Sequence, residues 1–226
     1  MRDGRDRRGD HRAGQSQPVQ DTTGSSIRDC FAAASACFTE VVARVPDGAW
    51  DHPALGVWNV RDLVGHTGRA LSTIETYLEK EPTGDTLDGP VAYFVATRAL
   101  LSDPDAVTRR GREAGAALGE DPVGAIADLA RRVTGLVDGT ADGASVASPV
   151  GTITLVDYLP SRTFELTVHG LDLARALGVD PPPSLQPAVS ASLDLAGRLA
   201  GTLGHAPELL LLITGRTGLR EGISIV

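Results

Sequence analysis

The chain has 226 residues, of which 42% are hydrophobic and 4% aromatic, and its formal net charge is −8. This length fits one domain with appendages, and the apolar fraction is enough for a core built mainly from Leu, Val and Ala. The negative charge argues against nucleic acid as a partner, and no segment has the unbroken apolar length of a membrane span.

The two cysteines and the N-terminal segment indicate a cellular compartment. Cys30 and Cys37 lie seven residues apart in one helical pattern. At a rise of about 1.5 Å per residue they are about 10 Å apart, too far for a disulfide. We therefore expect reduced thiols and a cytoplasmic protein. Residues 1–26 are polar and Arg-rich with no apolar stretch, so they predict a disordered tail rather than a signal peptide.

Helical patterns begin directly after this tail. Apolar residues recur at helical spacing over residues 27–45, and Pro46 ends that pattern. Residues 46–58 read as a loop that Trp50 and Trp58 anchor on the protein. Asn59 is the predicted N-cap of a second helix, which extends to about residue 78.

The rest of the chain predicts more helices and one hairpin. Helices are expected over the ranges 91–101, 106–118, 122–137, 154–177 and 187–203, with an interruption over 102–105 and a loop over 139–151. Thr154 and Asp157 resemble a capping box, and Pro160 should kink the helix that they open. Two short strands, 209–214 and 222–226, are predicted around a Gly-rich turn. The expected fold is mainly α: an antiparallel helix bundle over residues 27–178, followed by an extension over 179–226 with one helix and a short β-hairpin.

Three side chains form a candidate metal site. Glu165 and His169 are four residues apart, which places them on one face of a helix. His66 lies on the earlier helix over 59–78, and all three sit on the flank of an apolar stripe, where two bundle helices can face each other. Two imidazoles and a carboxylate would leave open coordination positions on a divalent ion, as in catalytic sites. The alternative is a surface pair of Glu165 and His169 that binds no metal.

Two further residues are weaker candidates. Asp172, one turn after His169, could accept a hydrogen bond from an imidazole N–H of a metal ligand, or could be an ordinary surface acid. Arg216 in the C-terminal turn could meet a substrate carboxylate, or could simply be exposed. The sequence contains no P-loop, no dinucleotide-binding glycine motif, no Cys-x-x-Cys and no nucleophilic Ser elbow.

Two segments resemble a known family. The segment Leu55-Gly-Val-Trp-Asn-Val-Arg-Asp-Leu-Val-Gly-His66, preceded by Trp50, is similar to the opening of the mycothiol-dependent maleylpyruvate isomerase family, which is related to DinB-like bundles. The segment Tyr158-Leu-Pro-Ser-Arg-Thr-Phe-Glu-Leu-Thr-Val-His169, continuing to Gly178, is similar to that family's second metal segment. The likeness covers roughly residues 27–178.

The resemblance implies a DinB-like four-helix core in which His66, Glu165 and His169 hold zinc or another divalent metal. It implies mycothiol as cosubstrate, and an actinobacterial origin that the 20 Arg against one Lys also suggests. Only about 45 residues follow the triple proline, where the isomerase has a larger C-terminal domain.

The expected function is an enzyme that activates this thiol for S-transfer to, or cis–trans isomerisation of, a small electrophile. It would act as a monomer or homodimer. The alternatives are a non-catalytic metal- or ligand-binding bundle, and a purely structural helical protein.

Overall fold

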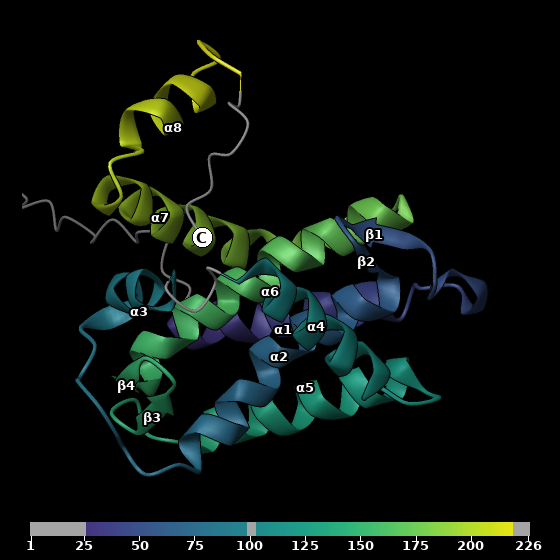
Figure 1. Cartoon of the computed structure of the whole chain (residues 1–226), viewed down its shortest axis with the longest axis horizontal. Coiled ribbons are helices and arrows are strands. Elements are labelled where there is room, and N and C mark those ends of the chain that lie inside the picture. The colour runs from purple at the N-terminus through teal and green to yellow at the C-terminus, as the bar shows by residue number, and fades with distance from the viewer. Residues whose placement is uncertain (1–25, 99–102, 219–226) are drawn as a thin grey trace, which may run out of the picture.

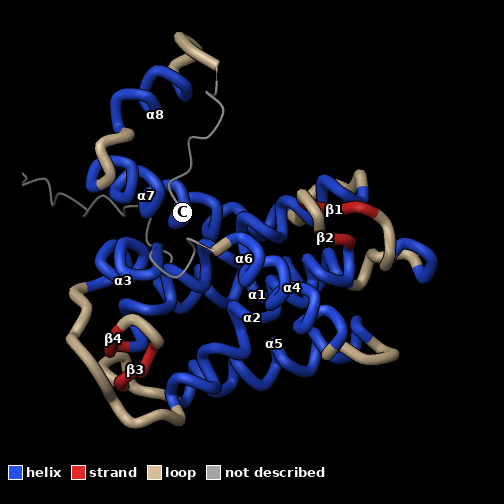
Figure 2. The backbone as a smooth tube through the Cα atoms, in the orientation of Figure 1, coloured by secondary structure: helices blue, strands red, loops and turns tan. Residues whose placement is uncertain are grey.

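The computed structural model describes residues 26–98 and 103–218, and the described chain is mainly helical (Figures 1 and 2). The helices are α1 (Ile27–Val42), α2 (Val60–Leu78), α3 (Gly89–Thr97), α4 (Pro104–Ala116), α5 (Pro122–Gly139), α6 (Leu155–Leu177), α7 (Gln186–Thr202) and α8 (Ala206–Ile213). Two antiparallel hairpins join strands β1 (Pro53–Leu55) with β2 (Trp58–Asn59) and β3 (Ser145–Ser148) with β4 (Gly151–Thr154). Among the described residues, no helix is both long and apolar enough to cross a lipid bilayer.

Local signals in the sequence set the ends of the helices. The Asn59 side chain accepts a hydrogen bond from the Asp62 backbone N–H at 2.8 Å, and the Thr154 hydroxyl caps α6, as predicted. Gly178 ends α6 in the left-handed conformation with φ of 67°. Of the predicted tail 1–26, only Ser26 lies within the described residues, and it caps α1 through a capping box with Asp29.

Four helices surround the main core. α1 contacts both α5 and α6, and α2 contacts the same two helices, so the four close into a ring. The largest side chains that are fully buried include Phe31 and Phe38 from α1, Leu63 and Leu71 from α2, and Ile126 from α5. This core fixes α2 and α6 beside each other and running in opposite directions (Figure 1).

The other four helices of the described chain lie outside the ring, and among them α3 packs on α6 and α7. α4 packs closely on α2, where Gly65 and Gly115 let the two backbones approach. α7 packs on α6 and α1. α8 packs on α7 and projects from the body of the molecule (Figure 1), and none of its residues is buried.

The predicted strand 209–214 is wrong, because residues 209–213 belong to helix α8 and Thr214 is its C-cap. Its run of leucines favours a helix over a strand, since Leu is unbranched at Cβ and loses little rotamer freedom in a helix. The other predicted strand, 222–226, lies outside the described residues.

Both predicted loops contain hairpins that local pattern did not indicate. Residues 46–58 include β1 and the first residue of β2, and residues 139–151 include β3 and the first residue of β4. The β3–β4 hairpin buries Val146 and Ile153 against the bundle, and its outer edge accepts a hydrogen bond from the Leu87 backbone. Such short strands are stabilised by these tertiary contacts rather than by a period of their own.

Candidate metal centre

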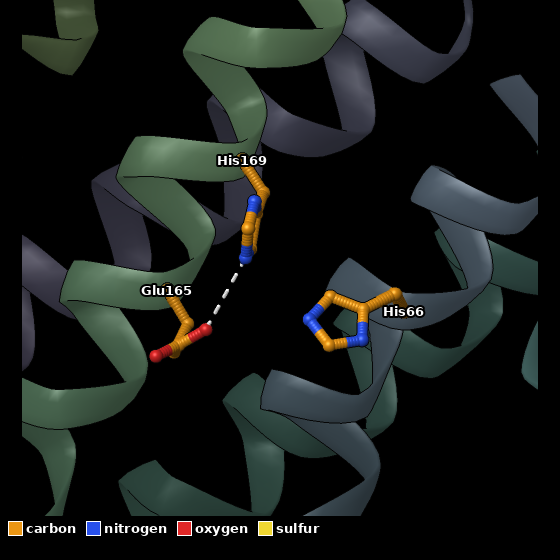
Figure 3. A group of neighbouring side chains, drawn as sticks. All are labelled: His66, Glu165 and His169. Atoms are coloured by element: carbon orange, nitrogen blue, oxygen red, sulfur yellow. Dashed lines mark ion pairs between the residues drawn. The ribbon is translucent and has the colours of Figure 1, made fainter. Parts of the chain in front are cut away.

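His66, Glu165 and His169 converge between α2 and α6 (Figure 3). One potential ligand atom from each residue lies within 4.8 Å of the other two. Glu165 and His169 project from one face of α6 toward α2, and one ring nitrogen of His66 points back at them (Figure 3). The helical spacing of four residues and the packing of two core helices together produce this convergence.

Two carboxylates flank His169. Its Nε2 lies 3.4 Å from a carboxylate oxygen of Glu165, and its Nδ1 lies 3.1 Å from a carboxylate oxygen of Asp172. Burial opposes protonation of the imidazole, but the hydrogen bonds to Asp172 and Glu165 outweigh it and raise the pKa of His169 to about 9. In the metal-free protein His169 is therefore positively charged at neutral pH.

The pKa of Glu165 is shifted in the opposite sense. Burial alone would raise it, but the hydrogen bond from His169 and the positive charge of Arg162 lower the pKa of Glu165 below its usual range. Glu165 is therefore an anion at neutral pH, which is the state in which a carboxylate binds a metal ion.

His66 sits in a more apolar environment. Its ring packs on Trp58 with centroids 4.3 Å apart, and it meets the His169 ring edge-on at 5.0 Å. Burial, and then the charge on His169, lower the pKa of His66 to about 4. The imidazole is thus neutral and has a lone pair available for a ligand. Its Nδ1 is buried and has no hydrogen-bond partner among the described residues.

The three residues fit a divalent ion. A tetrahedral ion with ligand distances of about 2.1 Å separates its ligand atoms by about 3.4 Å. The distance between His169 Nε2 and the nearer carboxylate oxygen of Glu165 has this value. The donor set of two imidazoles and one carboxylate suits zinc. Asp172 holds the far nitrogen of His169, so that Nε2 is the nitrogen facing the group.

A cavity of about 310 Å³ opens beside this group. Its wall includes His66 and Glu165, together with side chains from α2, α3, α4 and α6 and from the β3–β4 turn. Three arginines also line it: Arg69, Arg110 and Arg162. Sequence reasoning did not single them out. One sequence feature could have identified Arg162. It lies one turn before Glu165, which places an arginine on the apolar side of a core helix.

The structure places the other sequence-predicted residue elsewhere. Arg216 follows α8, is exposed, and donates a hydrogen bond to the Thr214 carbonyl at 3.5 Å. Neither it nor any residue of α8 is among those that line the cavity. Trp58 anchors its loop as expected, donating from Nε1 to the Thr108 carbonyl, and it also supports the His66 ring.

Comparison with known protein families identifies a family for most of the chain. Residues 31–174 match the family model described as the mycothiol maleylpyruvate isomerase N-terminal domain. The matched range is more than half of the chain and contains α2, α6 up to Ala174 and all three residues of the His-Glu-His group. Neither the curated proteins nor the solved structures give a match.

Proposed function

The chain belongs to the mycothiol maleylpyruvate isomerase N-terminal domain family, and from this premise we propose that it is a metal-dependent enzyme acting with a low-molecular-weight thiol. The proposed thiol is mycothiol, and the proposed reaction is S-transfer to, or cis–trans isomerisation of, a small electrophile. The ring of α1, α2, α5 and α6 would be a DinB-like four-helix core. The observation that carries the proposal is the convergence of His66, Glu165 and His169 beside a cavity.

The three converging residues would hold the ion, with zinc as the proposed metal. When bound, such an ion supplies a Lewis acid that lowers the pKa of a thiol ligand, so that a thiolate is present at neutral pH. Asp172 accepts a hydrogen bond from His169 Nδ1 and fixes the tautomer that leaves Nε2 free. Trp58 packs on His66 and restricts the orientation of its ring.

The thiol chemistry needs no protein nucleophile. In S-transfer, the thiolate sulfur forms a bond to carbon while the bond to the leaving group breaks, and the leaving group departs with the electron pair. The thiol proton goes to solvent. In isomerisation, the thiolate adds to a carbon–carbon double bond, the resulting single bond rotates, and elimination returns the thiolate. Cys30 and Cys37 lie on α1 and are not among the residues that line the cavity.

One observation supports a second candidate, a bundle that binds metal or a small ligand without turnover. His169 is already paired with Glu165 and Asp172, so its positive charge has partners without an ion. The same contacts support both candidates, and only an assay of turnover separates them.

The test measures metal content and thiol-dependent turnover in the same preparations. The wild-type protein should contain about one equivalent of zinc and should convert members of an electrophile panel only when mycothiol is present. His169→Ala should lose metal and turnover together. His52→Ala, which removes an exposed loop imidazole, and Cys37→Ala should retain both.

Two results would contradict the enzyme proposal. Metal without thiol-dependent product across the panel would favour the non-catalytic bundle. Full turnover in His169→Ala would show that the group does not activate the thiol.

A further inference from the structure

Arg162 is a buried cation that forms no ion pair with a carboxylate of the described residues. It lies on α6, is 9% exposed and lines the cavity beside the His-Glu-His group. Its guanidinium rests on the ring of Tyr158 at 4.7 Å and on that of Tyr93 at 5.4 Å. Within residues 26–98 and 103–218, no carboxylate oxygen lies within 4.0 Å of its nitrogens.

Neutral groups accept hydrogen bonds from only some of the N–H groups of this guanidinium. Nε donates to the Ser161 hydroxyl at 3.1 Å, and Nη2 donates to the Tyr93 hydroxyl at 3.4 Å. A guanidinium has five N–H donors, so the described residues leave most of them without an acceptor. Burying a cation costs free energy unless it is paired, and Lys and Arg are rarely buried without a partner. The position is therefore better explained by an anion that enters the cavity than by stability of the bundle.

The cavity as a whole favours an anion. Arg69 and Arg110 line it from α2 and α4, whereas Glu165 is the one acid among its lining residues. A carboxylate oxygen of Glu165 lies 3.4 Å from Nε2 of His169, so the negative charge of Glu165 is already paired with His169. In a partly buried space of this kind the three arginines attract an anion more strongly than they would in open water.

The spacing along the helices sets where the anion binds. Arg162 precedes Glu165 by three residues on α6, and Arg69 follows His66 by three residues on α2. Because α2 and α6 run in opposite directions (Figure 1), both arginines lie on the same side of the His-Glu-His group. Three residues correspond to about 4.5 Å along a helix axis. Because Arg162, His66 and Glu165 line the same cavity, an anion at Arg162 would lie beside that group.

We propose that Arg162 binds the carboxylate of the electrophilic substrate and holds its reactive carbon toward the His66–Glu165–His169 group. The planar guanidinium forms paired hydrogen bonds to the two carboxylate oxygens, a geometry that Lys cannot reproduce. Arg69 and Arg110 attract the anion into the cavity. The substrate class is a short electrophile that carries a carboxylate. This inference rests on the proposed function for the reaction, but not for the binding of the anion.

The test uses propionate, which cannot react, and its neutral isostere propionamide. Their dissociation constants are measured by ligand-observed NMR titration on zinc-loaded and on metal-free protein. Propionate should bind at least about tenfold more tightly than propionamide in both forms, as expected for charge-assisted hydrogen bonds. Arg162→Met should remove this preference, and Arg162→Lys should retain only part of it. Arg198→Met, which removes an exposed arginine of α7, should leave it unchanged.

Several outcomes would overturn the inference. Equal binding of propionate and propionamide by the wild type would do so without any variant, even if Arg162→Met failed to fold. Propionate binding that requires zinc would show that the metal, rather than Arg162, holds the anion. Unchanged binding in folded Arg162→Met would exclude Arg162.

The failures of the two proposals can be told apart. If propionate binding depends on Arg162 but no acid is converted with the thiol, only the proposed reaction is contradicted. Turnover that is equally fast on an acid and on its amide would contradict the carboxylate subsite alone.

Discussion

Gly65 lies at a close approach of α2 and α4, and it directly precedes His66. A Cβ atom on this residue would lie 2.2 Å from the Gly115 backbone nitrogen and 2.4 Å from the Ala114 carbonyl carbon. Non-bonded heavy atoms normally approach to about 3.5 Å, so Gly65→Ala requires the helices to separate by about 1 Å. The clashing atoms are backbone, so no side chain can rotate away.

The expected loss of stability follows from two opposing terms. Replacing Gly by Ala inside a helix adds up to about 1 kcal/mol of helix propensity. Overpacking that shifts backbone costs about 1–3 kcal/mol or more, and this clash is at the severe end. We expect the free energy of unfolding to fall by about 2 kcal/mol, and Tm by about 4–8 °C for a chain of this size.

The assay is urea and thermal unfolding followed by far-UV circular dichroism. Gly135→Ala on α5 is the matched control, because no atom lies within 4 Å of the added Cβ. That variant should be as stable as the wild type, or more stable by up to about 1 kcal/mol. If Gly65→Ala were as stable as Gly135→Ala, the close packing of α2 on α4 would be refuted.

Two further predictions concern His169. Asp172→Asn should weaken zinc binding by about 10- to 100-fold in a competition titration with a chelator, because the His169 tautomer loses its carboxylate partner; unchanged affinity would show that Asp172 does not orient this ligand. In metal-free protein the raised pKa of His169, about 9, means that its stabilising contribution is complete below the unfolded pKa of about 6.5 and is lost as pH rises through 9. The stability difference between wild type and His169→Ala in EDTA should therefore shrink by about 2–3 kcal/mol from pH 6 to pH 10, and a constant difference would contradict the pairing with Asp172 and Glu165.

Local sequence patterns determined most of the helices and the residues of the candidate site. The apolar repeats that predicted α2 and α6 also placed His66, Glu165 and His169 on their flanks. The caps at Asn59 and Thr154 were readable because capping depends on residues within one turn. A pair separated by four residues on a helix needs no knowledge of the fold to be recognised.

Tertiary packing decided the features that depend on distant residues. The β3–β4 hairpin is stabilised by burial of Val146 and Ile153 and by an edge hydrogen bond from Leu87, so no local period indicated it. Whether Arg162 has an acid beside it depends on what α2, α3 and α4 bring to the cavity. The sequence alone determined which side chains share a helix face, because that follows from a repeat of 3.6 residues. Only the packing of α2 against α6 decided that two such faces meet, because the contact joins residues about 100 positions apart in the chain.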